Sequence, residues 1–307
     1  MAVVIPELFS AAVNARMENS LRIGKIAFDA TSIAENIKEC GDTIHFPVVD
    51  RIGKAVTMKK GDKLEPHDLS MTDNVAKIKM VGDAVTLYDI DKHQVKASLV
   101  DLLTEQLGDA MAEAVDTDFV VEMDNNAVYK TPVANATSIT ADEIEAGFDV
   151  WGDDVADTSY AGIIINSRLR KVIKGFDQFT KMDRSYSKDG NGVVTEDGII
   201  GYWNGIIPVI ICNNNTFDDT LKECKTYIVK KNALGVIWQK EANTEEERDS
   251  LHKRTFLSAD ELYAVKLLNS KGVSILRKTI TATSNADDTT KSNADDTTKS
   301  GTDETKE

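Results

Sequence analysis

Histidines and paired acidic residues are the side chains of this sequence that could bind a metal ion or transfer protons. The four histidines lie far apart along the chain: His45, His67, His93 and His252. They do not form the HxH, HxxxH or HExxH spacings from which a local metal site is built. Asp153 and Asp154 are adjacent, so on a helix their carboxylates point in different directions. The sequence therefore predicts neither a metal site nor a carboxylate pair for acid–base catalysis.

Nucleotide-binding and nucleophile motifs are also missing from the sequence. There is no GxGxxG behind a strand, no GxxxxGK[ST] and no GxSxG. Residues 183–197 are rich in oxygen ligands, but they lack the glycine at the sixth position of a calcium-binding EF-hand loop. Gly190-Asn-Gly192 fits a flexible turn. We expect no cofactor and no enzymatic activity; a hydrolase or transferase with a dispersed site is an alternative.

The composition is that of a globular protein with an acidic excess. Lys and Arg number 36 against 51 Asp and Glu, which gives a formal net charge of −15. This charge argues against a protein whose main task is to grip nucleic acid, because that requires clustered basic residues. The cysteines are odd in number and widely spaced, which predicts reduced thiols: Cys40, Cys212 and Cys224. Without a membrane-length apolar run or a secretory signal, we expect the protein to stay where it is made.

The first ninety residues predict a weak helix and then a long extended excursion. Residues 7–24 carry Leu8, Ala12, Ala15 and Leu21 at near-helical spacing. Residues 41–49 alternate as a strand, with Pro47 marking an edge or a bulge, and a second extended run covers 71–89. The outer part of the excursion, residues 51–63, opposes one acidic residue, Asp62, with five basic residues: Arg51, Lys54, Lys59, Lys60 and Lys63. We expect this basic tip to make contacts between subunits.

A long helix follows the excursion. From about Lys92 to Met123 the chain has no proline and one glycine. Apolar residues recur at three- and four-residue spacing: Val95, Leu99, Leu103, Leu107, Ala110 and Ala114. A helix of about 30 residues would be roughly 45 Å long, which is unusual in a globular protein. The pattern does not hold the sustained heptads of a coiled coil.

The region 138–245 mixes helices with short apolar strands. Thr140 and Glu143 form a capping box that opens a helix running to about Asp154. Strands are expected at 162–165, 206–211, 227–229 and 234–238, with a helix at 168–173. Residues 253–277 return to strands, and the turn 270–272 fits a hairpin. Helices and strands do not alternate strictly, so the fold class is α+β.

The last residues differ from the rest of the chain. Ser-Asn-Ala-Asp-Asp-Thr-Thr-Lys occupies 284–291 and recurs unchanged at 292–299, and a degenerate copy fills 300–307. Because the segment has no large apolar residue, burial cannot offset the entropy cost of ordering it. We expect residues 281–307 to be a disordered, solvated tail.

Several short motifs resemble one family when they are taken in order. Gly41-Asp-Thr-Ile-His-Phe-Pro47 is similar to a GDTIxxP motif at the start of an extended loop, and Lys60-Gly-Asp-Lys-Leu-Glu65 to the return of that loop. Asp116-Thr-Asp118 is similar to the acidic end of a long helix. Gly198-Ile-Ile-Gly201, residues 205–213, Tyr263-Ala-Val-Lys-Leu267 and Val273-Ser-Ile-Leu276 resemble the later strands. The chain thus resembles the major capsid proteins of tailed bacteriophages over about residues 1–280.

The resemblance implies the tailed-phage major capsid fold, with an N-terminal arm, an extended β loop, a long spine helix, a peripheral domain and an axial domain. The implied division is 1–40 for the arm, 41–90 for the extended β loop, 91–137 for the spine helix and peripheral domain, 138–245 for the axial domain, 246–280 for the closing strands of the peripheral domain, and 281–307 for the tail.

The same resemblance implies a structural subunit that self-assembles into hexamers and pentamers of an icosahedral head enclosing double-stranded DNA. Its partners would be further copies of itself, a separate scaffolding protein, a portal protein and possible cementing or decoration proteins. DNA would be contacted non-specifically at most, and no membrane would be involved. The protein would be found in the virion after assembly in the bacterial host cytoplasm. Another self-assembling phage part, such as a tail-tube protein, is the alternative within this class.

Overall fold

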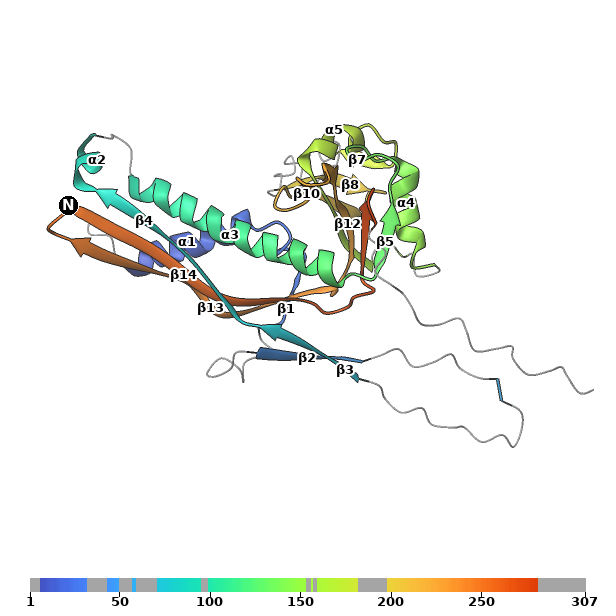
Figure 1. Ribbon diagram of the computed structural model, residues 1–307, viewed down its shortest axis with the longest axis horizontal. Coiled ribbons are helices and arrows are strands. Elements are labelled where there is room, and N and C mark those ends of the chain that lie inside the picture. The colour runs from blue at the N-terminus through green and yellow to red at the C-terminus, as the bar shows by residue number, and fades with distance from the viewer. Residues whose placement is uncertain are drawn as a thin grey trace, which may run out of the picture.

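The computed structural model describes residues 6–31, 43–49, 57–58, 71–94, 99–152, 156, 159–181 and 198–280. Figure 1 shows a long twisted sheet with one long helix lying along it, a compact unit of strands and short helices at one end, and a two-stranded hairpin on the side away from that helix. Sheets and helices are mixed without regular alternation, so the predicted α+β class is confirmed. The predicted tail, 281–307, lies outside the described residues.

The compact unit is built on a seven-stranded mixed sheet. In spatial order its strands are β5 (Tyr129–Pro132), β15 (Val273–Arg277), β12 (Thr226–Lys230), β6 (Tyr160–Ile165), β9 (Ile207–Ile211), β8 (Ile199–Trp203) and β7 (Phe179–Lys181). The β5–β15 and β6–β9 pairs are parallel and the others antiparallel. Ile163, Ile165, Val209 and Ile228 are buried in its core. In β6 and β9, neighbouring residues that point to opposite faces of the sheet are both apolar, as is typical of strands covered on both faces.

Short helices border this sheet. They are α4 (Ala141–Asp149), the 3-10 turn η3 (Ser167–Leu169) and α5 (Arg170–Ile173). The capping box of α4 is confirmed: Thr140 accepts the N–H of Glu143, and the Glu143 carboxylate accepts the N–H of Thr140. The helix ends at Asp149 and not near Asp154, because the backbone turns tightly there and Gly152 adopts a left-handed φ of 59°.

The long sheet has four strands and one face covered by helices. Its spatial order is β1 (Phe28–Asp29), β13 (Leu234–Asp249), β14 (Arg254–Leu267) and β4 (Lys79–Tyr88). The helices α1 (Pro6–Ser20) and α3 (Leu99–Asn126) pack together, and α1 also contacts β13 while α3 contacts β14. Alternate residues of β14 face these helices, among them Leu257, Ala259 and Tyr263.

Three small elements complete the described chain. β2 (Thr43–Val49) and β3 (Met71–Lys77) form a two-stranded antiparallel sheet, which agrees with the expected edge position of Pro47. β10 (Phe217–Asp218) and β11 (Glu223–Cys224) form another. The short helix α2 (Asp89–Gln94) follows β4.

The long helix begins later than predicted. Residues 89–94 form the separate helix α2, residues 95–98 lie outside the described part, and α3 starts at Leu99. Its 28 residues correspond to about 42 Å. Its buried side was partly mispredicted: Leu107 is buried, but Ala110 is exposed and Ala114 half-buried. The larger side chains take the interior positions: Met111, Val115, Phe119 and Met123.

The buried face of α1 was predicted only in part: Leu21, just after the helix, is buried as expected, but the two alanines are not. Ala12 and Ala15 are exposed, whereas the residues that pack against the core are Phe9, Val13, Met17 and Leu21. These four recur every four residues and bury more apolar surface than the alanines could. The helix therefore turns the side with the larger apolar side chains toward the core, and the side with the alanines toward solvent.

Sheet membership differs from the prediction in two places. The turn 270–272 does not form a hairpin, because β15 pairs with β12 and β5 while β14 pairs with β13 and β4. The segment 234–238 was expected among the strands of the region 138–245. It is instead the beginning of β13 in the long sheet. The extended run 71–89 likewise divides between two sheets, with β3 paired to β2 and β4 paired to β14. Residue alternation gives a strand's buried face but not its partner.

Candidate interaction surfaces

The β2–β3 hairpin is fixed to the outer face of the long sheet, on the side away from α3. Ile44 of β2 and Ala76 of β3 are buried against Ile237 of β13 and Ala264 of β14. In addition, the Asn74 side-chain amide donates to the carbonyl oxygen of Leu268 over 3.2 Å. The hairpin is therefore anchored to the body through Ile44, Asn74 and Ala76, and residues 50–70 connect Val49 to Met71 in the sequence.

The predicted basic tip falls within residues 50–70. All five residues lie outside the described part of the chain: Arg51, Lys54, Lys59, Lys60 and Lys63. Cys40 lies outside it too, whereas Cys212 and Cys224 are buried free thiols, as predicted. Burial raises the pKa of Cys212 to about 12, so this thiol is a poor nucleophile.

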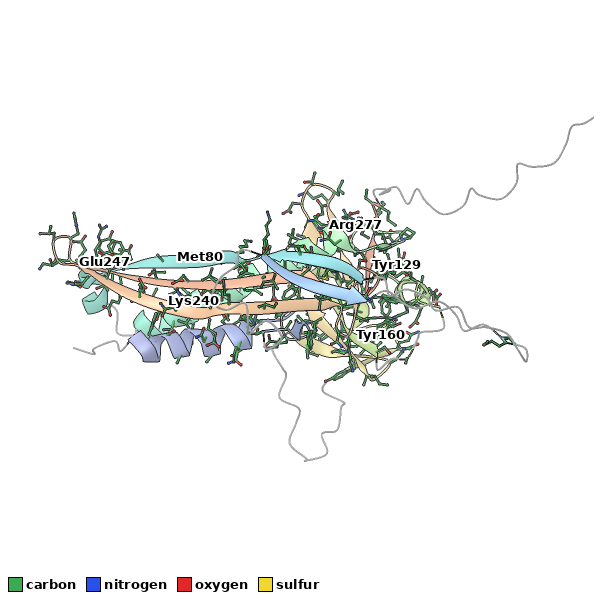
Figure 2. All side chains as sticks on the ribbon, turned by 90° about the horizontal axis from the view of Figure 1, so that it is seen from below. Met80, Tyr129, Tyr160, Lys240, Glu247 and Arg277 are labelled. Carbon is green, nitrogen blue, oxygen red and sulfur yellow. The ribbon has the colours of Figure 1, made fainter. Side chains whose placement is uncertain are left out.

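An acidic segment lies on the long sheet, where sequence reasoning did not single out a surface. Glu241, Glu245, Glu246 and Glu247 on the distal half of β13 are exposed. Figure 2 shows Glu247 near the far end of the long sheet, away from Tyr160 and Arg277 in the compact unit. The glutamates are close together in the sequence, which can be read without a structure. That they lie on one exposed stretch of a strand follows only from the assignment of β13.

The turn between β13 and β14 forms the tip of the long sheet at that same end and is held by several hydrogen bonds and ion pairs. The Asp249 carboxylate accepts the backbone N–H groups of Leu251 and His252 and pairs with the Arg254 guanidinium at 3.0 Å. The His252 backbone N–H, the His252 ring and Arg254 together lower the pKa of Asp249 to about 2. Arg248 binds both carboxylate oxygens of Asp89, at 2.6 and 2.7 Å.

Apolar side chains are exposed around this tip. Leu251 is 89% exposed, and Ile90 of α2 is 64% exposed. Met80, farther along β4 on the same sheet, is 65% exposed (Figure 2). Single exposed apolar side chains are ordinary on protein surfaces, so a contact at this tip is a hypothesis to be tested by substitution.

A buried aspartate holds the chain that follows α1. Asp116 of α3 accepts the backbone N–H groups of Arg22, Ile23 and Gly24 at 3.0–3.1 Å. Burial raises the pKa of this carboxyl to about 6, although the three N–H bonds act in the opposite direction. Sequence reasoning had noted Asp116 only as a motif residue. Its role here is to anchor the backbone.

Two further aspartates tie α3 to the sheets. Asp118 accepts the Tyr263 hydroxyl of β14 at 2.7 Å and pairs with Lys79 of β4. Asp124 accepts the Tyr227 hydroxyl at 2.7 Å and pairs with Lys225. The helix is therefore bonded both to the long sheet and to the compact unit.

Two polar cavities lie beside this framework, with volumes of about 450 and 700 Å³. In the first, Arg16 is paired with Asp109 at 2.8 Å, and the Arg22 guanidinium donates to the carbonyl oxygen of Ile211. The second is bordered by Arg168, which stacks on the Phe217 ring at 3.6 Å. Within the described ranges, no three His, Cys, Asp or Glu side chains gather as metal ligands, and no helix is long and apolar enough to cross a membrane.

Comparisons with known proteins give matches among solved structures. No family model matches the chain, and no curated protein does. A chain from Mycobacterium phage Che8 is 19% identical, with a TM-score of 0.55 over 83% of this chain and 90% of that one. The capsid of a native GTA particle is 9% identical, with a TM-score of 0.58 over 84% and 89%. A virus-like particle from Pyrococcus furiosus is 11% identical, with a TM-score of 0.56 over 90% and 100%.

At these identities the likeness establishes the fold. The chain has the tailed-phage major capsid fold, as the resemblance in the sequence implied. The division into arm, loop, peripheral and axial domains stays a prediction.

Proposed function

We propose that this protein is the structural subunit of an icosahedral phage head, forming hexamers and pentamers that enclose double-stranded DNA. The observation that carries the proposal is the fold match, which spans more than four-fifths of this chain and nearly nine-tenths of the GTA capsid chain. The mature capsid of bacteriophage PhiM1 has the same fold, at 12% identity and a TM-score of 0.52. A subunit of this kind works by contact and needs no catalytic group.

The further parts of the proposal come from the same resemblance. The chain would assemble in the bacterial host cytoplasm with a separate scaffolding protein, join a portal protein, and accept cementing or decoration proteins. The net charge of −15 fits a shell that faces DNA without gripping it. The extended β loop 41–90, the axial domain 138–245 and the peripheral segments 91–137 and 246–280 would each meet neighbouring copies.

The basic tip would contact the acidic segment of β13 on a neighbouring copy. Arg51, Lys54, Lys59, Lys60 and Lys63 supply the positive charge. The exposed glutamates 245–247 supply the negative charge. The described root of the hairpin supports this arrangement, because Ile44, Ala76 and the Asn74 hydrogen bond fix it to the body of the subunit. Such charge pairing would guide encounter and weaken with salt.

Charge reversal tests this contact. Replacing Lys59 and Lys60 with Glu should slow shell assembly several-fold in light scattering, because like charges would face each other. Adding Glu245→Lys and Glu247→Lys to the same chain should restore the rate. Asp142→Lys and Asp177→Lys, two exposed positions of the compact unit, are the matched control when combined with the loop reversals and should not restore it. Equal rates for wild type and the loop variant would rule out the contact.

Electron microscopy of the purified full-length chain, co-expressed with its scaffolding protein, separates the candidate functions. Closed shells or hexameric capsomers support the shell subunit, whereas stacked rings or tubes would support a tail-tube protein. A tail-tube protein should also be β-dominated, without a helix as long as α3. A protein that stays monomeric under all these conditions would contradict the proposal and leave an enzyme with a dispersed site as the alternative.

A further inference from the structure

The contact between α1 and the long sheet centres on an irregularity of β13. The β13–β14 register pairs Lys240 with Leu262 and Asn243 with Asp260, so two residues of β13 bulge opposite one residue of β14. Within that bulge, the carbonyl oxygen of Ala242 accepts the Ser10 hydroxyl at 2.8 Å and the Asn14 side-chain amide at 3.2 Å. Both donors belong to α1. The helix therefore docks on the bulge through neutral hydrogen bonds.

The β14 residue opposite the bulge is Glu261. Its side chain is 0% exposed, and neither carboxyl oxygen has a hydrogen-bond partner among the described residues. The side-chain oxygen of Asn14 is also buried without a partner in that part of the chain. One junction thus holds a carboxyl group and an amide oxygen that both lack partners. A buried polar atom without a partner carries a large desolvation cost.

The surroundings of Glu261 are apolar and offer no balancing charge. Leu257, Ala259 and Tyr263 lie on the same face of β14 and are buried. Charged groups on the packed elements are engaged elsewhere: Arg16 of α1 with Asp109, Asp118 of α3 with Lys79 of β4, Glu122 of α3 with Lys266, and Lys240 of β13 with Asp260. Glu241 of β13 and Asp83 of β4 are exposed and share the carboxyl's sign. Burial accordingly raises the pKa of Glu261 to about 7.

The neutral and the ionised forms of Glu261 require different hydrogen-bond partners. The neutral carboxyl carries one O–H donor, which is the chemical complement of an acceptor such as the Asn14 oxygen. The ionised carboxylate has no donor and requires donors or water around it. Water can reach the site if one of the covering elements moves away.

The helix α1 lies over β13 at the bulge opposite Glu261, and its polar attachment to the sheet is the weaker one. α3 is held to it by the Tyr263–Asp118 bond and by the Lys79–Asp118 and Lys266–Glu122 ion pairs. α1 donates two neutral hydrogen bonds to the sheet, both to the carbonyl oxygen of Ala242, and its charged Arg16 pairs with Asp109 of α3. The Asp260 and Lys266 side chains of the sheet pair instead with Lys240 and Glu122. Charge-assisted bonds are about twice as strong as neutral ones, so α1 should yield first.

We propose that Glu261 is a protonation-controlled latch for α1: its neutral form keeps the helix docked on the bulge, and its ionised form favours undocking. The latch belongs to the single chain and goes beyond the proposed shell function. Its chemistry is a proton lost to solvent from the Glu261 carboxyl as α1 lifts and water enters.

Hydrogen exchange measured by mass spectrometry on the full-length chain tests the latch. Between about pH 6.5 and about pH 8.5, exchange of α1 amides, corrected for the intrinsic pH effect, should become about fourfold faster. This is the factor that linkage gives for a pKa of about 7 docked and 4.5 free. Asp116, with a pKa of about 6, is mostly ionised at both points and contributes little.

Two variants isolate the carboxyl. Glu261→Gln keeps the size and cannot ionise, so the pH response of α1 should vanish. Glu241→Gln, on the exposed side of the same bulge, is the matched control and should keep the fourfold response. A response that survives in Glu261→Gln, or is absent in the wild type, would overturn the latch. So would an equal response in the amides of β14, because that would be unfolding of the whole sheet.

Discussion

The compact unit and the long sheet treat buried charge in opposite ways. In the compact unit, the buried carboxylate of Glu223 is matched by the Arg277 guanidinium and by the N–H of Thr279 at 2.9 Å. In the long sheet, Glu261 is equally buried and has no partner among the described residues. The buried carboxylate of the first region thus has partners within the chain, whereas the buried carboxyl of the second carries an uncompensated desolvation cost. Both regions expose apolar side chains, among them Ile206 in the first and Met80 in the second.

The largest effect should come from breaking the matched charge of the compact unit. Arg277→Ala leaves Glu223 buried and uncompensated, which should lower the free energy of unfolding by about 3–5 kcal/mol. Urea denaturation followed by circular dichroism measures the change. Arg248→Ala, which removes an exposed pair with Asp89, is the control and should have little effect. If both variants lost a similar amount of unfolding free energy, the Arg277–Glu223 pair would be no more important for stability than an exposed ion pair.

An intermediate effect should come from neutralising the unmatched charge of the long sheet. Because folding raises the pKa of Glu261 from about 4.5 to about 7, its contribution to stability is present below pH 4.5 and lost as the pH rises to 7. Above pH 7, Glu261→Gln should therefore be more stable than the wild type, by up to about 3 kcal/mol. The two proteins should converge near pH 4.5. A variant less stable than the wild type at pH 8 would show that the carboxylate has a partner.

The smallest effect on folding should come from the exposed tip. Leu251→Ser removes a side chain that is 89% exposed, so the free energy of unfolding should change by less than about 0.5 kcal/mol. If the tip is a contact between copies, the same variant should assemble more slowly than the wild type in light scattering. Unchanged assembly would mean that the tip is not a contact.

Local signals in the sequence predicted individual elements well. The Thr140–Glu143 capping box placed the start of α4, and the long stretch without proline placed α3. What failed was partner choice: β15 joins β12 and β5, and β13 joins β14, because alternation encodes a strand's face but not its neighbour. These pairings depend on contacts between residues far apart in the chain.

For the candidate sites, too, the sequence predicts single features but not the contacts between distant segments. The basic residues 51–63 are readable from the sequence as a charge asymmetry, whereas the acidic surface on β13 that we propose as their partner required the strand assignment. Glu261 had a detectable signal, since Leu257, Ala259, Glu261 and Tyr263 fall on alternate positions of one strand. A glutamate in the apolar phase of a strand predicts a buried carboxyl. Its lack of a partner depends on the packing of α1 and α3, which the sequence does not reveal.

A cryo-electron microscopy reconstruction of the assembled particle would show whether and how copies of the chain meet in a shell. We expect a closed icosahedral shell in which residues 51–63 of one copy lie against the β13 glutamates of another, and in which the turn at Leu251 is covered by a neighbouring copy. Particles in which β13 and that turn face solvent would contradict this expectation, as would a chain that forms no particle with its scaffolding protein.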